Sequence, residues 1–130
     1  VPQDVFLFSD SIENNIKFGS INSSIKEVIE VSKISDIHTD ILGFKNKYKT
    51  ILGERGVNLS GGQKQRISIA RALIRKPKLL IFDDCLSAVD TETEENIINS
   101  LNNLDYSTTS IIVSHRISSI KNANKIIVLN

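Results

Sequence analysis

The stretch LLIFDDCLSAVD, residues 79–90, decides the fold class. Four apolar residues run directly into two adjacent carboxylates, Asp83 and Asp84. A short, continuous apolar run is typical of a strand that is buried on both faces of a parallel sheet. The runs SIIVSH at 110–115 and KIIVLN at 125–130 have the same character and predict two more such strands.

The segments between these runs predict helices. TETEENIINSLNNL, at 91–104, carries acids in its first turn and predicts a helix with Thr91 as its N-cap. A shorter helix is expected between the second and third apolar runs. The succession of strand, helix, strand, short helix and strand predicts an α/β fold with a parallel sheet.

The first half of the chain predicts further helices and one long loop. In SIENNIKFGS, Ile12 and Ile16 lie four residues apart before a glycine, which suits a short helix. SSIKEVIEVSKI, at 23–34, repeats apolar residues at helical spacing. Residues 43–58 contain three glycines and predict a loop.

A capping box opens the next helix. Ser60 is followed three residues later by Gln63, and Pro77 prevents the helix from extending further. We therefore divide the chain into a helical part, residues 1–75, and a strand-bearing part, residues 76–130.

The composition is that of an ordinary globular protein. The 130 residues are 40% hydrophobic and 24% charged, and a net charge of +1 gives no sign of a nucleic-acid-binding surface. Cys85 is the single cysteine, so no disulfide can form within the chain. No apolar run reaches the 18 residues of a membrane span. Because the chain begins at Val1, we expect it to be a piece of a longer protein.

Three polar residues fall where ligands bind in open α/β sheets, beyond the carboxyl ends of the strands. Asp83 suits a magnesium ion, Asp84 can polarise an attacking water, and His115 can contact a terminal phosphate or orient that water. Taken one at a time, each has an ordinary alternative: a turn acid at a strand end, or a structural histidine.

The segment LSGGQKQR, residues 59–66, predicts an anion site. Two glycines allow close approach to the backbone, and the helix that begins there presents free N–H groups. Taken alone, the same segment also fits an ordinary capped helix after a glycine-rich turn.

Together these motifs resemble the nucleotide-binding domain of ATP-binding-cassette (ABC) transporters over essentially the whole chain. LSGGQ matches the signature motif, LLIFDD the Walker B strand, Ser87–Asp90 the D-loop and His115 the switch histidine. VPQDVFLFSDSIENNIKFG resembles the segment after the Q-loop, with Gln3 as its glutamine. GERGVNLSGGQ, which contains Glu54, resembles exporters in particular. The resemblance implies part of a P-loop NTPase fold, with a RecA-like parallel sheet and a helical subdomain.

The phosphate-binding Walker A loop of that family has no counterpart in this sequence. ATP hydrolysis by this fold needs G-x-x-x-x-G-K-[ST], which in the family precedes the Q-loop. We expect the loop, the adenine-stacking aromatic residue and the transmembrane domain upstream of Val1. The 130 residues alone are therefore expected to have no ATPase activity.

The resemblance implies two such domains that pair head to tail around two ATP molecules with Mg²⁺. Gln3, Asp83, Asp84 and His115 would serve this chain's own site, with Asp83 and Gln3 at the magnesium. Ser60, Gly61, Gly62 and Gln63 would act in trans at the partner's site, and Asp90 would lie near the interface.

Asp84 stands where the family usually has glutamate. The missing methylene retracts the carboxylate by about 1.5 Å, one C–C bond, and a general base needs hydrogen-bond reach. We therefore expect a site that binds ATP but hydrolyses it slowly, as in heterodimeric exporters. A homodimer in which a water or a backbone shift compensates for Asp84 is the alternative.

The resemblance also leaves alternative functions. The favoured function is an exporter subunit at the cytoplasmic face of the membrane, joined to a transmembrane domain and binding no nucleic acid. A non-transport ABC-type ATPase, such as a DNA-repair or translation factor, and a non-catalytic interaction module are the alternatives. The transported substrate is open.

Overall fold

The computed structural model describes residues 1–53 and 57–129. Glu54, part of the exporter-like segment, lies outside the described residues. The elements in chain order are α1 (Ile12–Lys17), α2 (Ile25–Ile34), α3 (His38–Gly43), the 3-10 helix η1 (Lys47–Lys49), α4 (Gly61–Leu73), β1 (Leu79–Asp83), α5 (Thr91–Asn102), β2 (Thr109–Val113) and α6 (Ile117–Ile120).

The two strands form a parallel pair joined by the helical crossover α5. Leu79 pairs with Thr109 and Asp83 with Val113, so the two strands end at the same edge. The N-terminal residue extends the pairing, because Val1 N donates to the Ile81 carbonyl at 2.7 Å and Asp83 N donates to the Val1 carbonyl at 3.0 Å. The predicted strand–helix–strand order is confirmed.

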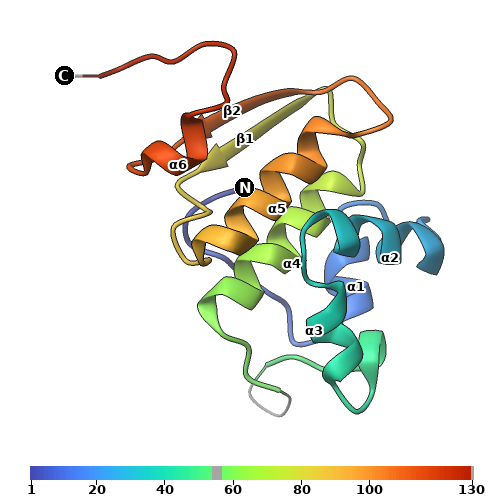
Figure 1. The fold of residues 1–130 in the computed structure, drawn as a ribbon. Helices are drawn as coiled ribbons and strands as arrows, with labels where there is room; N and C mark the ends of the chain where they lie inside the picture. Colours follow the sequence, from blue (N-terminus) through green and yellow to red (C-terminus); the bar gives the residue numbers. More distant parts are fainter. Residues whose placement is uncertain (54–56, 130) are drawn as a thin grey trace.

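The sheet is covered on one face only among the described residues. Leu80 and Phe82 are buried, and Figure 1 shows α4 and α5 beneath the strands. The opposite face is apolar and between 46% and 51% exposed at Leu79, Ile81, Ile111 and Val113. The prediction of strands buried on both faces is therefore wrong for this structure, since helices lie against a single side.

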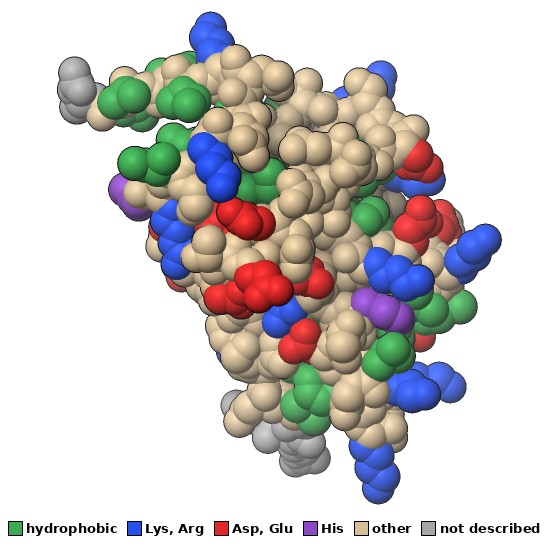
Figure 2. Space-filling view, in the orientation of Figure 1, with side chains coloured by type: hydrophobic (Ala, Val, Ile, Leu, Met, Phe, Trp, Pro, Cys, Tyr) green, Lys and Arg blue, Asp and Glu red, His purple; other side chains and the backbone are tan. Residues whose placement is uncertain are grey.

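The predicted third strand is also absent from the described residues. Residues 125–129 form no strand, and no hydrogen bond joins them to β1 or β2. Figures 1 and 2 show this segment projecting from the body, with its apolar side chains in the open. An extended segment becomes a strand only through a backbone partner, and this segment has none within the described chain.

The helical part packs around α4. Ile12 and Ile16 of α1 and Val28 of α2 are fully buried and join Ile67 of α4 in the hydrophobic core. Gly19 allows the close approach of α1 to α4, because a Cβ there would lie 2.1 Å from the Arg71 carbonyl oxygen. No helix in the described ranges is both long enough and apolar enough to cross a bilayer.

Two local details differ from the sequence prediction. Asp90, not Thr91, caps α5: its Oδ1 accepts from Thr93 N at 2.9 Å, and Thr91 is the first helical residue. The N-cap position belongs to the last non-helical residue, and the Asp90 carboxylate reaches the Thr93 N–H from there. The helix α3 was not predicted, because no side chain caps its N-terminus at Ile37.

Candidate functional site

The capping box at the start of α4 is confirmed. Ser60 Oγ accepts from Gln63 N at 3.2 Å, and Ser60 N donates to Gln63 Oε1 at 3.0 Å. The extended backbone of Ser60, with φ −64° and ψ 161°, turns directly into the helix. Both hydrogen bonds of the capping box thus join Ser60 to Gln63, within the motif itself.

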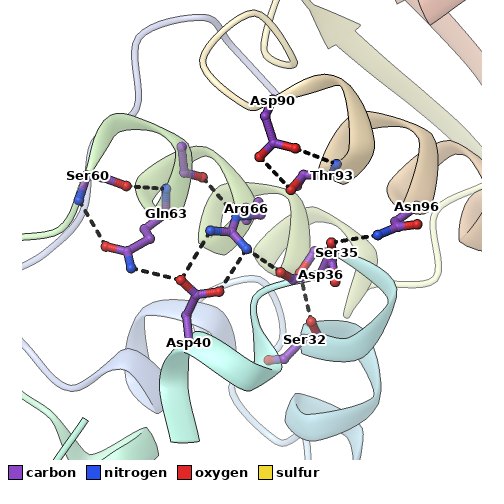
Figure 3. Close-up of polar contacts among 11 residues, drawn as sticks. Ser32, Ser35, Asp36, Asp40, Ser60, Gln63, Arg66, Asp90, Thr93 and Asn96 are labelled. Carbon is purple, nitrogen blue, oxygen red and sulfur yellow. Dashed lines mark hydrogen bonds and ion pairs between the residues drawn. The ribbon is translucent and has the colours of Figure 1, made fainter. Parts of the chain in front are cut away.

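A second set of contacts ties this motif to α3, as Figure 3 shows. Gln63 Nε2 donates to Asp40 Oδ1 at 2.9 Å. Arg66 donates to both Asp40 oxygens, from Nη1 to Oδ2 at 2.9 Å and from Nη2 to Oδ1 at 3.3 Å. Burial alone would raise the pKa of Asp40, but the hydrogen bonds from Gln63 and Arg66 and the charge of Arg66 hold it below its ordinary value.

The first turn of α4 keeps free donors. An α-helix leaves its first N–H groups without intrahelical partners. Within the described residues, the amides of Gly61 and Gly62 donate to no acceptor. Both glycines line a hollow of about 290 Å³, with Ser60–Gly62 on one side and Ala88–Asp90 on the other. The signature motif and the D-loop therefore face one shared space suited to an anion.

Gly62 is required by the packing of these two segments. A Cβ at that position would lie 2.9 Å from the backbone oxygen of Ala88. At Gly61 the nearest atom to such a Cβ is the Ala88 Cβ at 4.0 Å, an ordinary contact. The two glycines thus have different roles, although they are neighbours in the sequence.

At the carboxyl edge of β1 and β2, Asp84 meets Gln3. Gln3 Nε2 donates to Asp84 Oδ2 at 3.3 Å across 81 residues of sequence. Asp84 N donates to the Val113 carbonyl at 3.0 Å, and Ser87 Oγ donates to the Asp84 carbonyl at 2.7 Å. The backbone of Asp84 is left-handed, with φ +47°, a conformation that Asp and Asn tolerate better than most residues.

Asp83 and His115 lie at the same edge but are less constrained. Asp83 ends β1 and is exposed, and His115 follows β2 by two residues and is also exposed. Within the described chain, neither side chain has a hydrogen-bond partner, and no contact joins His115 to Asp84. The structure therefore brings Gln3 and Asp84 together and leaves Asp83 and His115 open beside them.

The described side chains do not enclose a magnesium ion by themselves. In residues 1–53 and 57–129, no three His, Cys, Asp or Glu side chains gather closely enough to enclose a metal. Mg²⁺ is commonly held by one or two carboxylates together with phosphate oxygens and water. Asp83 and Gln3 would therefore hold Mg²⁺ only together with the phosphate oxygens of a bound nucleotide.

Gln65 is a site residue that the sequence analysis missed. It is buried in α4, and its Nε2 donates to the carbonyl of Gln3. This bond holds the backbone of Gln3, from which the Gln3 side chain extends toward Asp84. The signal was present, since Gln65 lies within LSGGQKQR, but nothing in the sequence indicated its partner 62 residues away.

An ion pair with one buried partner, behind the carboxyl edge, was also missed. Glu94 is fully buried, and its Oε2 accepts from Arg116 Nη1 at 3.1 Å. Arg116 also donates to the Val89 carbonyl at 3.0 Å and the Ser87 carbonyl at 2.9 Å. Arg116, the residue after His115, thus connects the segment after β2 to both the D-loop and α5. In the sequence, Glu94 looked like an ordinary acid in the first turn of a helix.

The predicted site residues fall into two separate groups. The hollow at the start of α4 has Ser60, Gly61 and Gly62 in its wall together with Asp90. None of Gln3, Asp83, Asp84 and His115 lines that hollow. A single site that uses both groups is therefore not formed by the described residues of this chain.

Comparison with known proteins decides the family. A model described as "ABC transporter" matches residues 1–87, more than half of the chain. The chain belongs to the ABC transporter family. Residues 88–130 lie beyond that match, but the relatives described next align over nearly the whole chain.

Curated relatives extend the comparison. The multidrug resistance-like ATP-binding protein MdlA of Buchnera aphidicola subsp. Schizaphis graminum is 52% identical over 130 residues, covering 99% of this chain and 22% of that protein. The mitochondrial iron-sulfur clusters transporter ABCB7 of Danio rerio is 45% identical, covering 100% of this chain and 18% of that protein. This chain of the ABC family spans 10% to 22% of the length of such relatives.

A solved structure agrees with the sequence relatives. The chain superposes on a bacterial Atm1-family ABC exporter with ATP bound, with a TM-score of 0.86 and 42% identity over 92% of this chain and 21% of that one. The chain thus has the partial P-loop NTPase fold and corresponds to part of the nucleotide-binding domain of ABC exporters.

Proposed function

We propose that this chain supplies ATP-binding and ATP-hydrolysing residues to an ABC exporter, and that its own ATP site hydrolyses slowly. The observation that carries the proposal is the contact between Gln3 and Asp84 at the carboxyl edge, 3.3 Å long, in a chain of the ABC family. Parallel α/β sheets bind ligands at this edge. Asp84 lies at this edge together with Gln3, whose counterpart in the family lies beside the nucleotide.

The two ATP sites of the proposed assembly each take residues from both chains. The separation of the signature group from the carboxyl edge supports this arrangement, because Gly61 and Gly62 line a hollow that Asp84 does not line. Ser60–Gln63 would then meet nucleotide held by the partner, with Asp90 near the interface. Gln3, Asp83, Asp84 and His115 would serve nucleotide held by this chain.

Each residue at the carboxyl edge has a distinct proposed role. Asp83 and Gln3 would hold Mg²⁺, which supplies charge neutralisation at the phosphates when bound. His115, exposed and unconstrained, would reach the terminal phosphate or the attacking water. Asp84 would orient that water but lies one methylene further back than glutamate.

The geometry of Asp84 supports slow hydrolysis. Its carboxylate already accepts from Gln3, and its left-handed backbone is held by the bonds to Val113 and from Ser87. A shift of the backbone that compensated for the short side chain would break these contacts. We therefore favour a heterodimer in which the partner's site, completed by the intact signature motif of this chain, performs most of the hydrolysis.

The remaining parts of the proposal concern the whole protein. The relatives named as multidrug and iron-sulfur cluster transporters support export across a membrane. We propose a transmembrane domain in the same transporter, with these residues at its cytoplasmic face. The division at residues 75 and 76 into a helical and a strand-bearing part stays a prediction.

The test uses the full-length protein with its partner in lipid vesicles, with hydrolysis measured separately at each site. Asp83→Ala should remove hydrolysis at this chain's own site, and Ser60→Arg should reduce it at the partner's site roughly 10²-fold, the cost of losing one preorganised donor. Turnover at both sites that is unchanged by either variant contradicts the proposal. ATPase activity stimulated by DNA or RNA would favour the non-transport alternative.

A further inference from the structure

We propose that Asp40 is a positioning residue for the partner's ATP site, because it sets the orientation of the Gln63 amide and through it the position of Ser60. The inference rests on the proposed trans role of Ser60. Asp40 lies in α3, 20 residues before Ser60 in the sequence, and nothing in the signature motif indicates its role. Figure 3 shows the chain of contacts that joins the three residues.

The chemistry of the three groups allows one orientation. An ionised carboxylate only accepts hydrogen bonds, a backbone N–H only donates, and an amide side chain has one end of each kind. Asp40 Oδ1 therefore takes the Nε2 of Gln63, at 2.9 Å, and leaves Oε1 for Ser60 N, at 3.0 Å. The flipped amide would face donor to donor at Ser60 and acceptor to acceptor at Asp40.

Arg66 keeps Asp40 in the state that this orientation requires. Its guanidinium contacts both carboxylate oxygens, and the Arg66 side chain is only 13% exposed. Arg66 also donates to the carbonyl of Asp36 and, through Nε at 3.3 Å, to the carbonyl of Gly62. The start of α4 and the start of α3 are thus connected by one continuous polar network.

The network determines which groups stay free at the hollow. Ser60 N is bonded to Gln63, and Ser60 Oγ accepts from Gln63 N, so the hydroxyl proton is left to donate outward. Both ends of the Gln63 amide are occupied within the chain. Gln63 therefore positions Ser60, and the donors that remain for a phosphate are the Ser60 hydroxyl and the amides of Gly61 and Gly62.

The test exchanges the carboxylate and the amide between the two positions in the full-length protein with its partner. Asp40→Asn leaves one acceptor oxygen at position 40 for two donors, the Gln63 amide and the Arg66 guanidinium, and so no longer fixes the orientation of Gln63. Gln63→Glu places two carboxylates against each other. Each variant should lower kcat at the partner's site roughly tenfold to 10²-fold, the cost of a small misplacement of a binding group. KM at the partner's site should change far less, and ATP affinity at this chain's own site should not change.

The double variant Asp40→Asn with Gln63→Glu should recover most of the loss. A carboxylate at position 63 accepts from Ser60 N and from the new amide at position 40, whose oxygen accepts from Arg66. Glu13→Gln is the matched control, since Glu13 also pairs with a cation, Lys17 at 2.6 Å, but on α1. It should leave both sites unchanged.

The outcomes separate this inference from the function on which it rests. Ser60→Arg should reduce turnover at the partner's site roughly 10²-fold in the same assay. If it does so while Asp40→Asn leaves kcat at the wild-type value, the positioning role of Asp40 is wrong and the trans site stands. If both single exchanges impair turnover and the double variant is no better, the amide-orientation argument is wrong. If Ser60→Arg has no effect, the trans site and this inference both fail.

Discussion

The start of α4 and the carboxyl edge of the sheet differ in how much of their geometry this chain determines. At α4, Ser60, Gln63, Arg66 and Asp40 form a network in which each side chain has a partner in the same chain. At the carboxyl edge, Asp84 has one side-chain contact, with Gln3, and the exposed Asp83 and His115 have none among the described residues. One region is preorganised, and the other leaves its functional side chains open for groups supplied from elsewhere.

The largest expected effect concerns the support behind the carboxyl edge. Arg116→Ala removes the half-exposed cation from the fully buried carboxylate of Glu94, which keeps its hydrogen bonds from Ser118 and Ser119. The free energy of unfolding should fall by about 2–3 kcal/mol, the contribution of hydrogen bonds to a charged group. Lys121→Ala is the matched control, because Lys121 and Glu95 are about half exposed and such pairs contribute at most about 1 kcal/mol.

Urea unfolding of the nucleotide-binding domain measures both variants. A loss for Arg116→Ala no larger than that for Lys121→Ala would mean that the ion pair does not hold the segment after β2. The segment after β2 would then be unconstrained in its backbone as well as in its side chains, and the difference between the two regions would be larger.

A smaller effect is expected where α4 meets the D-loop. Gly62→Ala introduces a Cβ 2.9 Å from the Ala88 backbone oxygen and should destabilise the domain by about 1–3 kcal/mol, as overpacking commonly does. Gly61→Ala makes only an ordinary contact, 4.0 Å from the Ala88 Cβ, and should be neutral or slightly stabilising. Thermal unfolding of the two variants compares them, and equal midpoints would show that the D-loop yields to the added methyl group.

The sequence predicted the features that depend on neighbouring residues. It did not predict the side-chain contacts between residues far apart in the chain. The capping box of Ser60 and Gln63 spans three residues and was confirmed, and so was the order of β1, α5 and β2. Asp40 contacts Gln63 across 23 residues and Gln65 contacts Gln3 across 62, and no local pattern indicates either pair.

The errors in the predicted fold have the same cause. An apolar run predicts a strand, but a strand also needs a backbone partner, which residues 125–129 lack in the described chain. Burial of both sheet faces likewise depends on elements that no single run specifies. The ends of the two strands placed Asp83, Asp84 and His115 at the carboxyl edge, as the sequence predicted, whereas the contact of Asp84 with Gln3 was not predicted.

The preorganised region should depend on pH through Asp40. Its pKa lies below the ordinary value in the folded state, so its contribution to stability is present above that ordinary value, about pH 4, and is lost as the pH falls through the lowered pKa. The difference in unfolding free energy between wild type and Asp40→Asn should therefore be larger at pH 7 than at pH 3. A difference that stays constant with pH contradicts a stabilising ionised Asp40.

The smallest expected effect is the most direct test of the central claim, that this chain's own site hydrolyses slowly because Asp84 is a poor base. Asp84→Asn keeps the side-chain length and the tolerance for a left-handed backbone, so it removes the charge and leaves the fold. Removing a working general base costs roughly 10²–10⁴-fold in rate. Single-site ATP turnover in the full-length pair is the measurement. The account predicts a change of less than about threefold at this chain's own site, and a collapse of hydrolysis there, with ATP still bound, would contradict it.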